Sequence, residues 1–314
     1  MNKKFAVIGA SGYIAPRHLQ AIRDVGGDLV AALDRHDSVG ILDSFFPNTE
    51  FFTEFEKFDY FVRSLQSDEK VGTVSICSPN HLHKSHIAFG LCAGANVICE
   101  KPLVLNPYDL DELVHLENVT GRCVNTILQL RVHPALVALK REIDAAPADK
   151  IFDVDLGYFT SRGKWYHQSW KGEEEKSGGI ATNIGVHFFD MLGFLFGKNA
   201  LSVAHHRSAD SAGGYLEFEK ARVRWVMSIN KDHLPAPTPH GQFTYRSITV
   251  DGKEIEFSGG FTDLHTVSYQ QVLEGRGFGV ETVRPAIELV SNLRTAPLQP
   301  RVGERHPLLR SVCK

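Results

Sequence analysis

Residues 5–15 read FAVIGASGYIA, and this run predicts how the first part of the chain folds. Phe5 to Ile8 is a short apolar run typical of a buried strand, and it stops at Gly9. Ala15 to Val25 then carries apolar residues at helical spacing. A strand, a glycine-rich turn and a helix in this order indicate the start of a parallel α/β sheet.

The turn itself has small residues at Gly9, Ser11 and Gly12, with Ala15 where the helix must pack close to the strand. A pyrophosphate group needs bare backbone N–H groups and a helix N-terminus pointing at it. The spacing is G-x-x-G-x-x-A, and such a turn can also serve only to connect a strand to a helix. We interpret it as a dinucleotide site because of the residues that follow.

An acidic residue stands where a dinucleotide site needs one. Leu29 to Leu33 is a second predicted buried strand, and Asp34 follows it about 20 residues past the turn. A carboxylate there binds the ribose 2′-hydroxyl and favours NAD, whereas Arg35 would tolerate the 2′-phosphate of NADP. The predicted contacts of this half of the cofactor are Gly9, Ser11, Gly12, Tyr13, Ile14, Asp34 and Arg35.

Polar residues also follow the next two predicted strands. Val71 to Cys77 is followed by SPNHLH (Ser78 to His83), and Ala95 to Cys99 is followed by EKP (Glu100 to Pro102). Ligands of open parallel sheets bind beyond the carboxyl ends of the strands. We therefore expect the nicotinamide half of the cofactor to meet Ser78, Asn80, His83, Glu100 and Lys101. The Lys101 ammonium would orient a substrate hydroxyl, the alternative being a surface ion pair with Glu100.

The three histidines of this region, His81, His83 and His86, are an alternative metal cluster. Helical spacing puts only His83 and His86 on one face, and no carboxylate or cysteine completes a ligand set. We therefore predict no metal site.

The second half of the chain shows a different pattern. Apolar and polar residues alternate in four segments, which indicates strands with one buried face: Phe152 to Thr160, Gly214 to Phe218, Val223 to Ile229 and Thr244 to Val250. Helical periodicity returns in Ile184 to Phe196 and in Glu281 to Leu293. Lys231 to Gly241 holds three prolines and is expected to be a surface loop. The predicted fold is an α/β Rossmann domain, residues 1–122, followed by an α+β domain with a large open, mostly antiparallel sheet, residues 123–314.

Composition narrows the class of protein. The 314 residues carry a net charge of −3, which gives no reason to expect a nucleic-acid partner. No apolar run reaches the ~18 residues of a membrane helix, and the N-terminus lacks the long apolar core of a signal peptide. The five cysteines are irregularly spaced without a C-x-x-C, as expected of reduced thiols. A soluble cytoplasmic protein is the resulting expectation.

The motifs GASGYIAPRH, SPNHLH and EKP, in this order, resemble those of the Gfo/Idh/MocA oxidoreductases, which act mainly on sugars and cyclitols. The resemblance spans nearly the whole chain, and EKP is its most specific element. It implies a Rossmann domain and a second domain whose open sheet often makes dimer or tetramer contacts. It also implies that Lys101 lies next to the reacting carbon.

The second signature of that family, G-G-x-x-x-D-x-G-x-H-x-x-D, is matched by GGIATNIGVHFFD, Gly178 to Asp190. His187 stands at the position of the catalytic histidine, while Asn183 replaces the usual aspartate. An amide cannot take a proton, so His187 is the expected general base and Lys101 its partner. Asn183 can still hydrogen-bond a substrate hydroxyl. The alternative for His187 is a structural histidine at the start of a helix.

The segments NTILQLRVHP (Asn125 to Pro134) and SRGKWYHQSWKG (Ser161 to Gly172) are similar to one subfamily, the UDP-N-acetyl-2-amino-2-deoxyglucuronate 3-dehydrogenases. The resemblance implies NAD-dependent oxidation of the sugar C-3 hydroxyl in surface-polysaccharide (O-antigen) synthesis. It also implies that 2-oxoglutarate can accept the hydride from NADH, although no residue of this sequence indicates this.

A UDP-sugar acid needs cations for its diphosphate and carboxylate, and this part of the chain supplies them. The predicted substrate contacts are Lys101, Arg131, Arg162, Lys164, Tyr166, Asn183 and His187, with Lys171 in the same loop. Gln129 and Trp165 are expected at the cofactor. Two alternatives stay open: a dehydrogenase of a free sugar or cyclitol, and a non-catalytic NAD-binding regulator.

Overall fold

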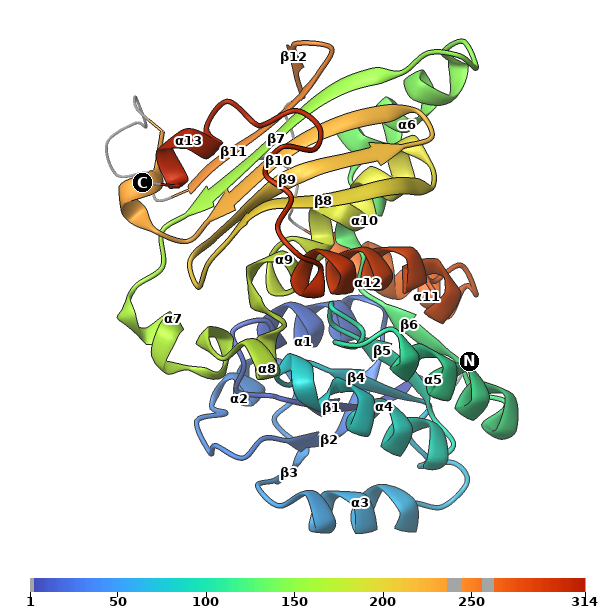
Figure 1. The fold of residues 1–314 in the computed structure, drawn as a ribbon. Helices are drawn as coiled ribbons and strands as arrows, with labels where there is room; N and C mark the ends of the chain where they lie inside the picture. The colour runs from blue at the N-terminus through green and yellow to red at the C-terminus, as the bar shows by residue number, and fades with distance from the viewer. Residues whose placement is uncertain (1–2, 236–243, 256–262, 314) are drawn as a thin grey trace. The chain divides into compact units, whose positions relative to one another are not determined.

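The computed structural model describes residues 3–235, 244–255 and 263–313. Its contacts divide the chain into two compact units (Figure 1). The first unit is Met1–Val132 with Thr262–Arg284, and the second is His133–Phe261 with Pro285–Lys314. The predicted loop at Lys231 to Gly241 begins with a short 3₁₀ helix, Lys231–His233, and its residues from 236 lie outside the described part.

A parallel sheet forms the centre of the first unit. Its six strands lie in the order β3-β2-β1-β4-β5-β6, the arrangement of a Rossmann fold. Their bounds are β1 Lys4–Ile8, β2 Asp28–Leu33, β3 Glu50–Phe52, β4 Thr73–Ile76, β5 Asn96–Cys99 and β6 Val124–Thr126. The four predicted strands are confirmed as β1, β2, β4 and β5, whereas the three-residue strands β3 and β6 were not predicted.

Helices cover both faces of this sheet because both faces are apolar. On one face, Phe5 and Val7 of β1 pack with Leu19 and Ile22 of α1. On the other face, α4 approaches closely enough that a Cβ at Gly90 would lie 2.8 Å from Val97. The helices of this unit are α1 Ala15–Asp24, α2 Ile41–Phe45, α3 Phe55–Ser64, α4 His83–Cys92, α5 Tyr108–Thr120 and α11 Leu264–Leu273.

One of these helices comes from far along the chain. Tyr269 of α11 is fully buried, and its ring centroid lies 6.0 Å from that of Phe5. Thr266 Oγ1 donates a hydrogen bond of 2.9 Å to Asp24, at the end of α1. Helix α11 is therefore part of the first core.

The first unit also continues past the predicted boundary at residue 122. Strand β6 follows that point, and its Val124 pairs with Val97 of β5 in the parallel register. The contacts accordingly extend the first unit to Val132 and add the segment around α11. A three-residue strand and a helix held by tertiary packing leave no periodic pattern that marks such a division.

The second unit contains a mixed, mostly antiparallel sheet. Its strand order is β12-β11-β7-β10-β9-β8, and β7 and β10 form its parallel pair. The strands are β7 Phe152–Thr160, β8 Asn199–Arg207, β9 Ser211–Phe218, β10 Ala221–Ser228, β11 Thr244–Val250 and β12 Lys253–Glu254. The predicted α+β architecture is confirmed, and β8 is a further strand of it.

Helix packing in the second unit follows the alternation of the strands. Trp225 of β10 lies edge-to-face on Phe189 of α10, with ring centroids 5.1 Å apart, while the neighbouring Val226 packs with Leu309 of α13. The helices are α6 Pro134–Ala145, α7 Lys164–Gln168, α8 Glu174–Ser177, α9 Gly179–Asn183, α10 Val186–Phe196 and α13 Leu309–Val312; α12 is Val280–Thr295.

Among the described residues, no single helix is both long enough and apolar enough to span a membrane. One bent pair of helices, Glu174–Asn183 and Val186–Phe196, meets the criterion when the two are taken together, by length and composition only.

Candidate functional site

The turn after β1 has no room for a side chain at its first residue. Gly9 has φ +92°, and a Cβ on it would lie 2.6 Å from the carbonyl carbon of Cys77. Both the left-handed backbone and the close approach to the end of β4 therefore require glycine. Gly12 is less constrained, since a Cβ there would meet Gly9 O at 3.1 Å. Ser11 and Ile14 are half-buried, while Tyr13 is 87% exposed.

Asp34 is buried at the end of β2 and is fixed by the backbone of the turn. Its Oδ2 accepts the N–H of Ser11 at 2.9 Å, and its Oδ1 accepts the N–H of His36 at 2.9 Å. A carboxylate held in this way beside a glycine-rich turn fits the adenosine ribose of a dinucleotide. Arg35 is exposed.

The residues after β4 form a hydrogen-bonded group. Ser78 Oγ lies 2.8 Å from His86 Nδ1, and Asn80 is buried. His83 is also buried: its Nε2 lies 2.9 Å from Ser78 O and its Nδ1 lies 2.7 Å from Pro102 O. His83 thus links the ends of β4 and β5, and its contact with a cofactor stays a prediction. Burial lowers the pKa of His86 to about 4, so this histidine is neutral at pH 7.

The EKP segment follows β5, with a cis peptide bond between Lys101 and Pro102. Glu100 is buried, and its Oε1 lies 2.9 Å from His18 Nε2 and 3.0 Å from His265 Nε2. The alternative of a simple surface ion pair between Glu100 and Lys101 does not describe this carboxylate, which faces two histidines. Sequence reasoning missed both histidines, although His18 belongs to the quoted motif GASGYIAPRH.

Gln129 and Arg131 lie on the short 3₁₀ helix Gln129–Val132 of the first unit. Gln129 Oε1 is buried and has no hydrogen-bond partner among the described residues, so it offers an acceptor to a ligand. The Arg131 guanidinium lies 5.4 Å from the ring centroid of Phe278 and donates to Thr282 O at 3.5 Å.

The glycine signature of the second unit shapes two successive short helices. Gly178 and Gly179 have φ +79° and +70°, and a Cβ at Gly185 would lie 2.4 Å from Ala181 O. Gly178 and Gly179 allow α9 to begin directly after α8, and Gly185 lies at the junction between α9 and α10. His187 is the second residue of α10 and is half-buried, and its role as general base stays a prediction.

Asn183 is tied to the segment that carries the predicted cations. Its Nδ2 donates a hydrogen bond of 2.8 Å to the hydroxyl of Tyr166, which is buried. Burial raises the pKa of Tyr166, and the Asn183 hydrogen bond and the nearby Arg162 act in the opposite direction. A positively charged group therefore lies close to this tyrosine.

Two like charges meet beside these residues. Burial and the neighbouring Arg162 guanidinium both lower the pKa of Lys171. The Lys171 ammonium also lies 5.2 Å and 5.5 Å from the ring centroids of Trp165 and Trp170. In the described part of the chain neither Arg162 nor Lys171 forms an ion pair with a carboxylate, so the pair can receive an anion. Lys164 and Trp165 are exposed.

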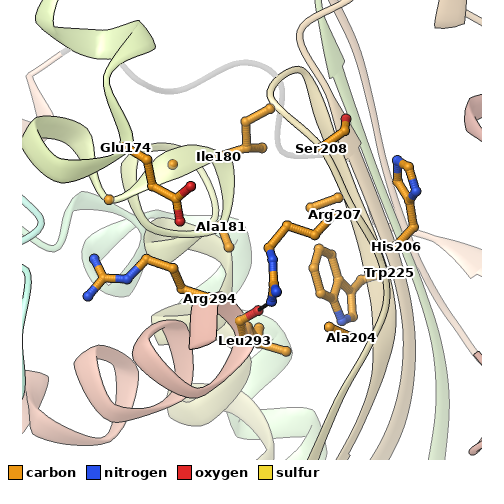
Figure 2. A pocket seen from close by; sticks show the side chains of 13 residues that line it. Glu174, Ile180, Ala181, Ala204, His206, Arg207, Ser208, Trp225, Leu293 and Arg294 are labelled. Atoms are coloured by element: carbon orange, nitrogen blue, oxygen red, sulfur yellow. Dashed lines mark hydrogen bonds between the residues drawn. The ribbon is translucent and has the colours of Figure 1, made fainter. Parts of the chain in front are cut away.

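A small cavity lies beside the glycine signature but holds none of the predicted site residues (Figure 2). Its volume is about 30 Å³, enough for a water molecule and too small for a sugar nucleotide. Arg207 extends across it from β8 and donates to Leu293 O at 2.8 Å, at the end of α12 (Figure 2). Figure 2 shows Glu174, Trp225 and Arg294 around the same space. This cavity therefore belongs to the packing of the second unit.

The chain is similar to proteins of known family and structure. Residues 3–127 match the Gfo/Idh/MocA oxidoreductase family model for the NAD-binding Rossmann fold, and residues 149–244 match its C-terminal alpha/beta domain. The crystal structure of the WlbA (WbpB) dehydrogenase from Thermus thermophilus, in complex with NAD and UDP-GlcNAcA, is 52% identical over 97% of this chain and 99% of that chain, with a TM-score of 0.93. A second structure of that dehydrogenase, with NAD and alpha-ketoglutarate, matches equally.

Curated relatives are more distant. A 2,7-anhydro-N-acetylneuraminate hydratase of Mediterraneibacter gnavus is 28% identical over 62% of this chain, and a putative oxidoreductase of Bacillus subtilis is 25% identical over 77%. The chain spans about half the length of the first (49%) and 65% of the second. One of these relatives is a hydratase and the other a putative oxidoreductase, so similarity to them does not identify a substrate. On these matches, the chain belongs to the Gfo/Idh/MocA family of NAD-binding oxidoreductases.

Proposed function

We propose that this protein oxidises the C-3 hydroxyl of UDP-N-acetylglucosaminuronate (UDP-GlcNAcA) to a 3-keto sugar with NAD. The observation that carries the proposal is the similarity to the Thermus dehydrogenase, 52% identical over nearly both whole chains and crystallised with this sugar nucleotide and NAD. The residues of the chain itself give three further lines of support: the cofactor turn, the cations and the proton-transfer groups.

The cofactor turn fits NAD. Gly9 leaves its backbone bare at the end of β1, and the buried Asp34 carboxylate is held beside it by the N–H of Ser11. A carboxylate at this place accepts hydrogen bonds from the two hydroxyls of the adenosine ribose of NAD, and it repels the 2′-phosphate of NADP. Gln129 Oε1 adds an unused buried acceptor. NAD, when bound, supplies the acceptor for the hydride of C-3.

The cations support an acidic substrate. Burial and, after it, the charge of Arg162 lower the pKa of Lys171, and an incoming anion would stabilise both cations. In our proposal this pair binds the carboxylate or diphosphate of UDP-GlcNAcA. A free cyclitol carries no anionic group that Arg162 and Lys171 could bind. This cation pair therefore argues against the alternative of a neutral sugar or cyclitol as the substrate.

The proton-transfer groups are Lys101 and His187. In the proposed reaction His187 takes the proton of the C-3 hydroxyl, and the Lys101 ammonium stabilises the developing alkoxide. C-3 then loses a hydride, so the sugar gives up two electrons and two hydrogens in all. Asn183 and Tyr166 are proposed to hydrogen-bond the sugar, because their own contact of 2.8 Å fixes both side chains. A pure NAD sensor needs no such set of groups.

The assay is to mix the purified protein, NAD⁺ and UDP-GlcNAcA, with and without 2-oxoglutarate, and follow the absorbance of reduced nicotinamide and the sugar products. Formation of NADH, or of a 3-keto sugar together with 2-hydroxyglutarate, supports the proposal and reveals how the cofactor is recycled. A protein that binds NADH yet yields no product under either condition refutes the substrate assignment, and free sugars and cyclitols are then the next substrates.

Three accompanying expectations are part of the proposal. The protein acts in the cytoplasm, assembles as a homo-oligomer (dimer or tetramer), and serves surface-polysaccharide synthesis. Light scattering on the purified protein measures the assembly, and a monomeric mass would refute that part alone. Loss of the polysaccharide on deletion of the gene, restored by the wild-type copy, tests the pathway.

A further inference from the structure

A buried carboxylate with two histidine partners lies under the EKP segment. Glu100 Oε1 is 2.9 Å from His18 Nε2 and 3.0 Å from His265 Nε2. His18 comes from α1 and is fully buried, and His265 comes from α11 and is 4% exposed. Three side chains from distant parts of the chain thus meet at one oxygen atom.

The group is anchored further inside the first unit. His18 Nδ1 lies 2.7 Å from the hydroxyl of Tyr269, which is itself 2.7 Å from Ser75 Oγ on β4. Tyr269 and Ser75 are both fully buried. Because both ring nitrogens of His18 have a hydrogen-bond partner, the ring is held in one orientation.

The distances describe a hydrogen-bonded carboxylate. Burial alone would raise the pKa of Glu100, but the hydrogen bonds from His18 and His265 more than reverse this, and the pKa lies well below its ordinary value. Burial lowers the pKa of His18, against the effect of Glu100. An ionised Glu100 and a neutral His18 follow at pH 7. The two ring nitrogens of His18 face the Glu100 carboxylate and the Tyr269 hydroxyl, and this hydroxyl donates its own proton to Ser75 Oγ.

The same three residues are the group of possible metal ligands that the described part of the chain offers. A structural zinc site takes four ligands. The separations of 2.9 and 3.0 Å are also ordinary hydrogen-bond lengths. We therefore treat the group as a network of hydrogen bonds, and metal analysis of the purified protein checks this.

The other oxygen of Glu100 reaches the residue proposed to act on the substrate. Oε2 accepts the backbone N–H of Lys101 at 3.3 Å. We infer that His18 and His265 are positioning residues: they fix the Glu100 carboxylate, which in turn fixes the backbone from which the Lys101 ammonium acts. This inference rests on the proposed function for the role of Lys101, and it gives α11 a part in catalysis.

The test compares two substitutions of one histidine. Gln can offer an Nε2–H close to where His265 has its own, whereas Leu offers none. In His265→Leu we expect kcat per NADH-binding site to fall by about 10- to 100-fold, the cost of a misplaced reacting group. The KM for UDP-GlcNAcA and the Kd for NADH should stay within about twofold. His265→Gln should restore most of the lost kcat. Equal losses in both variants, or a loss of kcat that only mirrors a loss of NADH-binding sites, would overturn the inference.

Two further measurements keep the result clear. Tyr269→Phe keeps the buried ring and removes only the hydroxyl beside His18, so it should fold and lower kcat in the same direction; an unchanged kcat would count against the network. Amide hydrogen exchange of the NADH complex should show faster exchange at residue 101 in His265→Leu than in the wild type or His265→Gln. This readout needs no sugar, and it therefore separates a failure of the inference from a failure of the proposed function. Unchanged exchange, or stoichiometric metal in the purified protein, would also overturn it.

Discussion

Asp34 accepts the backbone N–H of Ser11 at 2.9 Å, so that one carboxylate joins the end of β2 to the glycine-rich turn after β1. Its second oxygen accepts the N–H of His36. Both bonds orient the carboxylate. It can still accept hydrogen bonds from a ligand, because each carboxylate oxygen accepts more than one. Asp34 is therefore preorganised for a ribose.

The first prediction concerns the choice of cofactor. Asp34→Asn keeps the shape of the side chain and removes its charge, so the 2′-phosphate of NADP is no longer repelled and Arg35 can reach it. The ratio of the Kd for NADP to that for NAD should fall at least about tenfold, or about 1.4 kcal/mol. Titration of the intrinsic fluorescence measures both constants. The exposed Asp37→Asn is the control, and an unchanged ratio in Asp34→Asn would refute the role of Asp34.

Gly9 gives a prediction about stability. In Gly9→Ala the new methyl group would lie 2.6 Å from the carbonyl carbon of Cys77 at a φ of +92°. The strain should lower the free energy of unfolding by about 1–3 kcal/mol and weaken NAD binding. Gly40→Ala is a matched control, since its φ is −55° and its Cβ would meet nothing within 4 Å. Denaturant unfolding compares the two, and equal stabilities would contradict the strain argument.

Lys171 should discriminate acidic from neutral sugars. Lys171→Met removes one of two adjacent cations, so the KM for UDP-GlcNAcA should rise by about 10-fold or more, while the KM for UDP-N-acetylglucosamine changes little. Because the pKa of Lys171 is lowered from 10.5, its charge is lost earlier as the pH rises, and affinity for the acidic sugar should weaken on that alkaline side. The exposed Lys198→Met is the control. A parallel rise for both sugars would show that Lys171 binds the diphosphate, which both share, and not the carboxylate.

Asn183 gives a prediction about the effect of an added negative charge. Asn183→Asp restores the residue usual in the family signature but adds a negative charge beside the Tyr166 hydroxyl. We expect the KM for UDP-GlcNAcA to rise by about 10-fold through repulsion, with the Kd for NADH unchanged. Steady-state kinetics beside Asn183→Ala separates charge from the loss of a hydrogen bond. A lower KM in the Asp variant would show that no anionic group lies near position 183.

The sequence predicts the long, apolar elements of this fold well. Runs such as Phe5 to Ile8, which stop at a glycine, are typical of a strand buried on both faces, and the alternation in Phe152 to Thr160 indicates a strand with one buried face. The strands β3 and β6 escape this reasoning because three residues are too few for a period. The return of α11 to the first unit depends on the burial of Tyr269, a tertiary contact without a local pattern.

The residues of the candidate site also fall into two groups: those that a local sequence pattern predicts and those that only tertiary packing brings together. The sequence identifies Gly9, Asp34 and Lys101 because each stands at the end of a predicted strand. It does not identify His18 and His265, because His265 lies 165 residues from Glu100 and only folding brings it to the carboxylate. The pairing of Asn183 with Tyr166 and the effect of Arg162 on Lys171 likewise come from packing, although all four residues lie in segments that the motifs had already marked.

Transfer of the C-3 hydrogen is the step that defines the proposed reaction. UDP-GlcNAcA carrying deuterium at C-3 is incubated with the protein and NAD⁺, and the nicotinamide and sugar are then analysed by mass spectrometry. We predict that the deuterium appears at C-4 of the reduced nicotinamide, or at C-2 of 2-hydroxyglutarate when 2-oxoglutarate is present, while the 3-keto sugar contains none. Deuterium that stays on the sugar, or passes to the solvent with no label on nicotinamide or 2-hydroxyglutarate, would contradict the assignment.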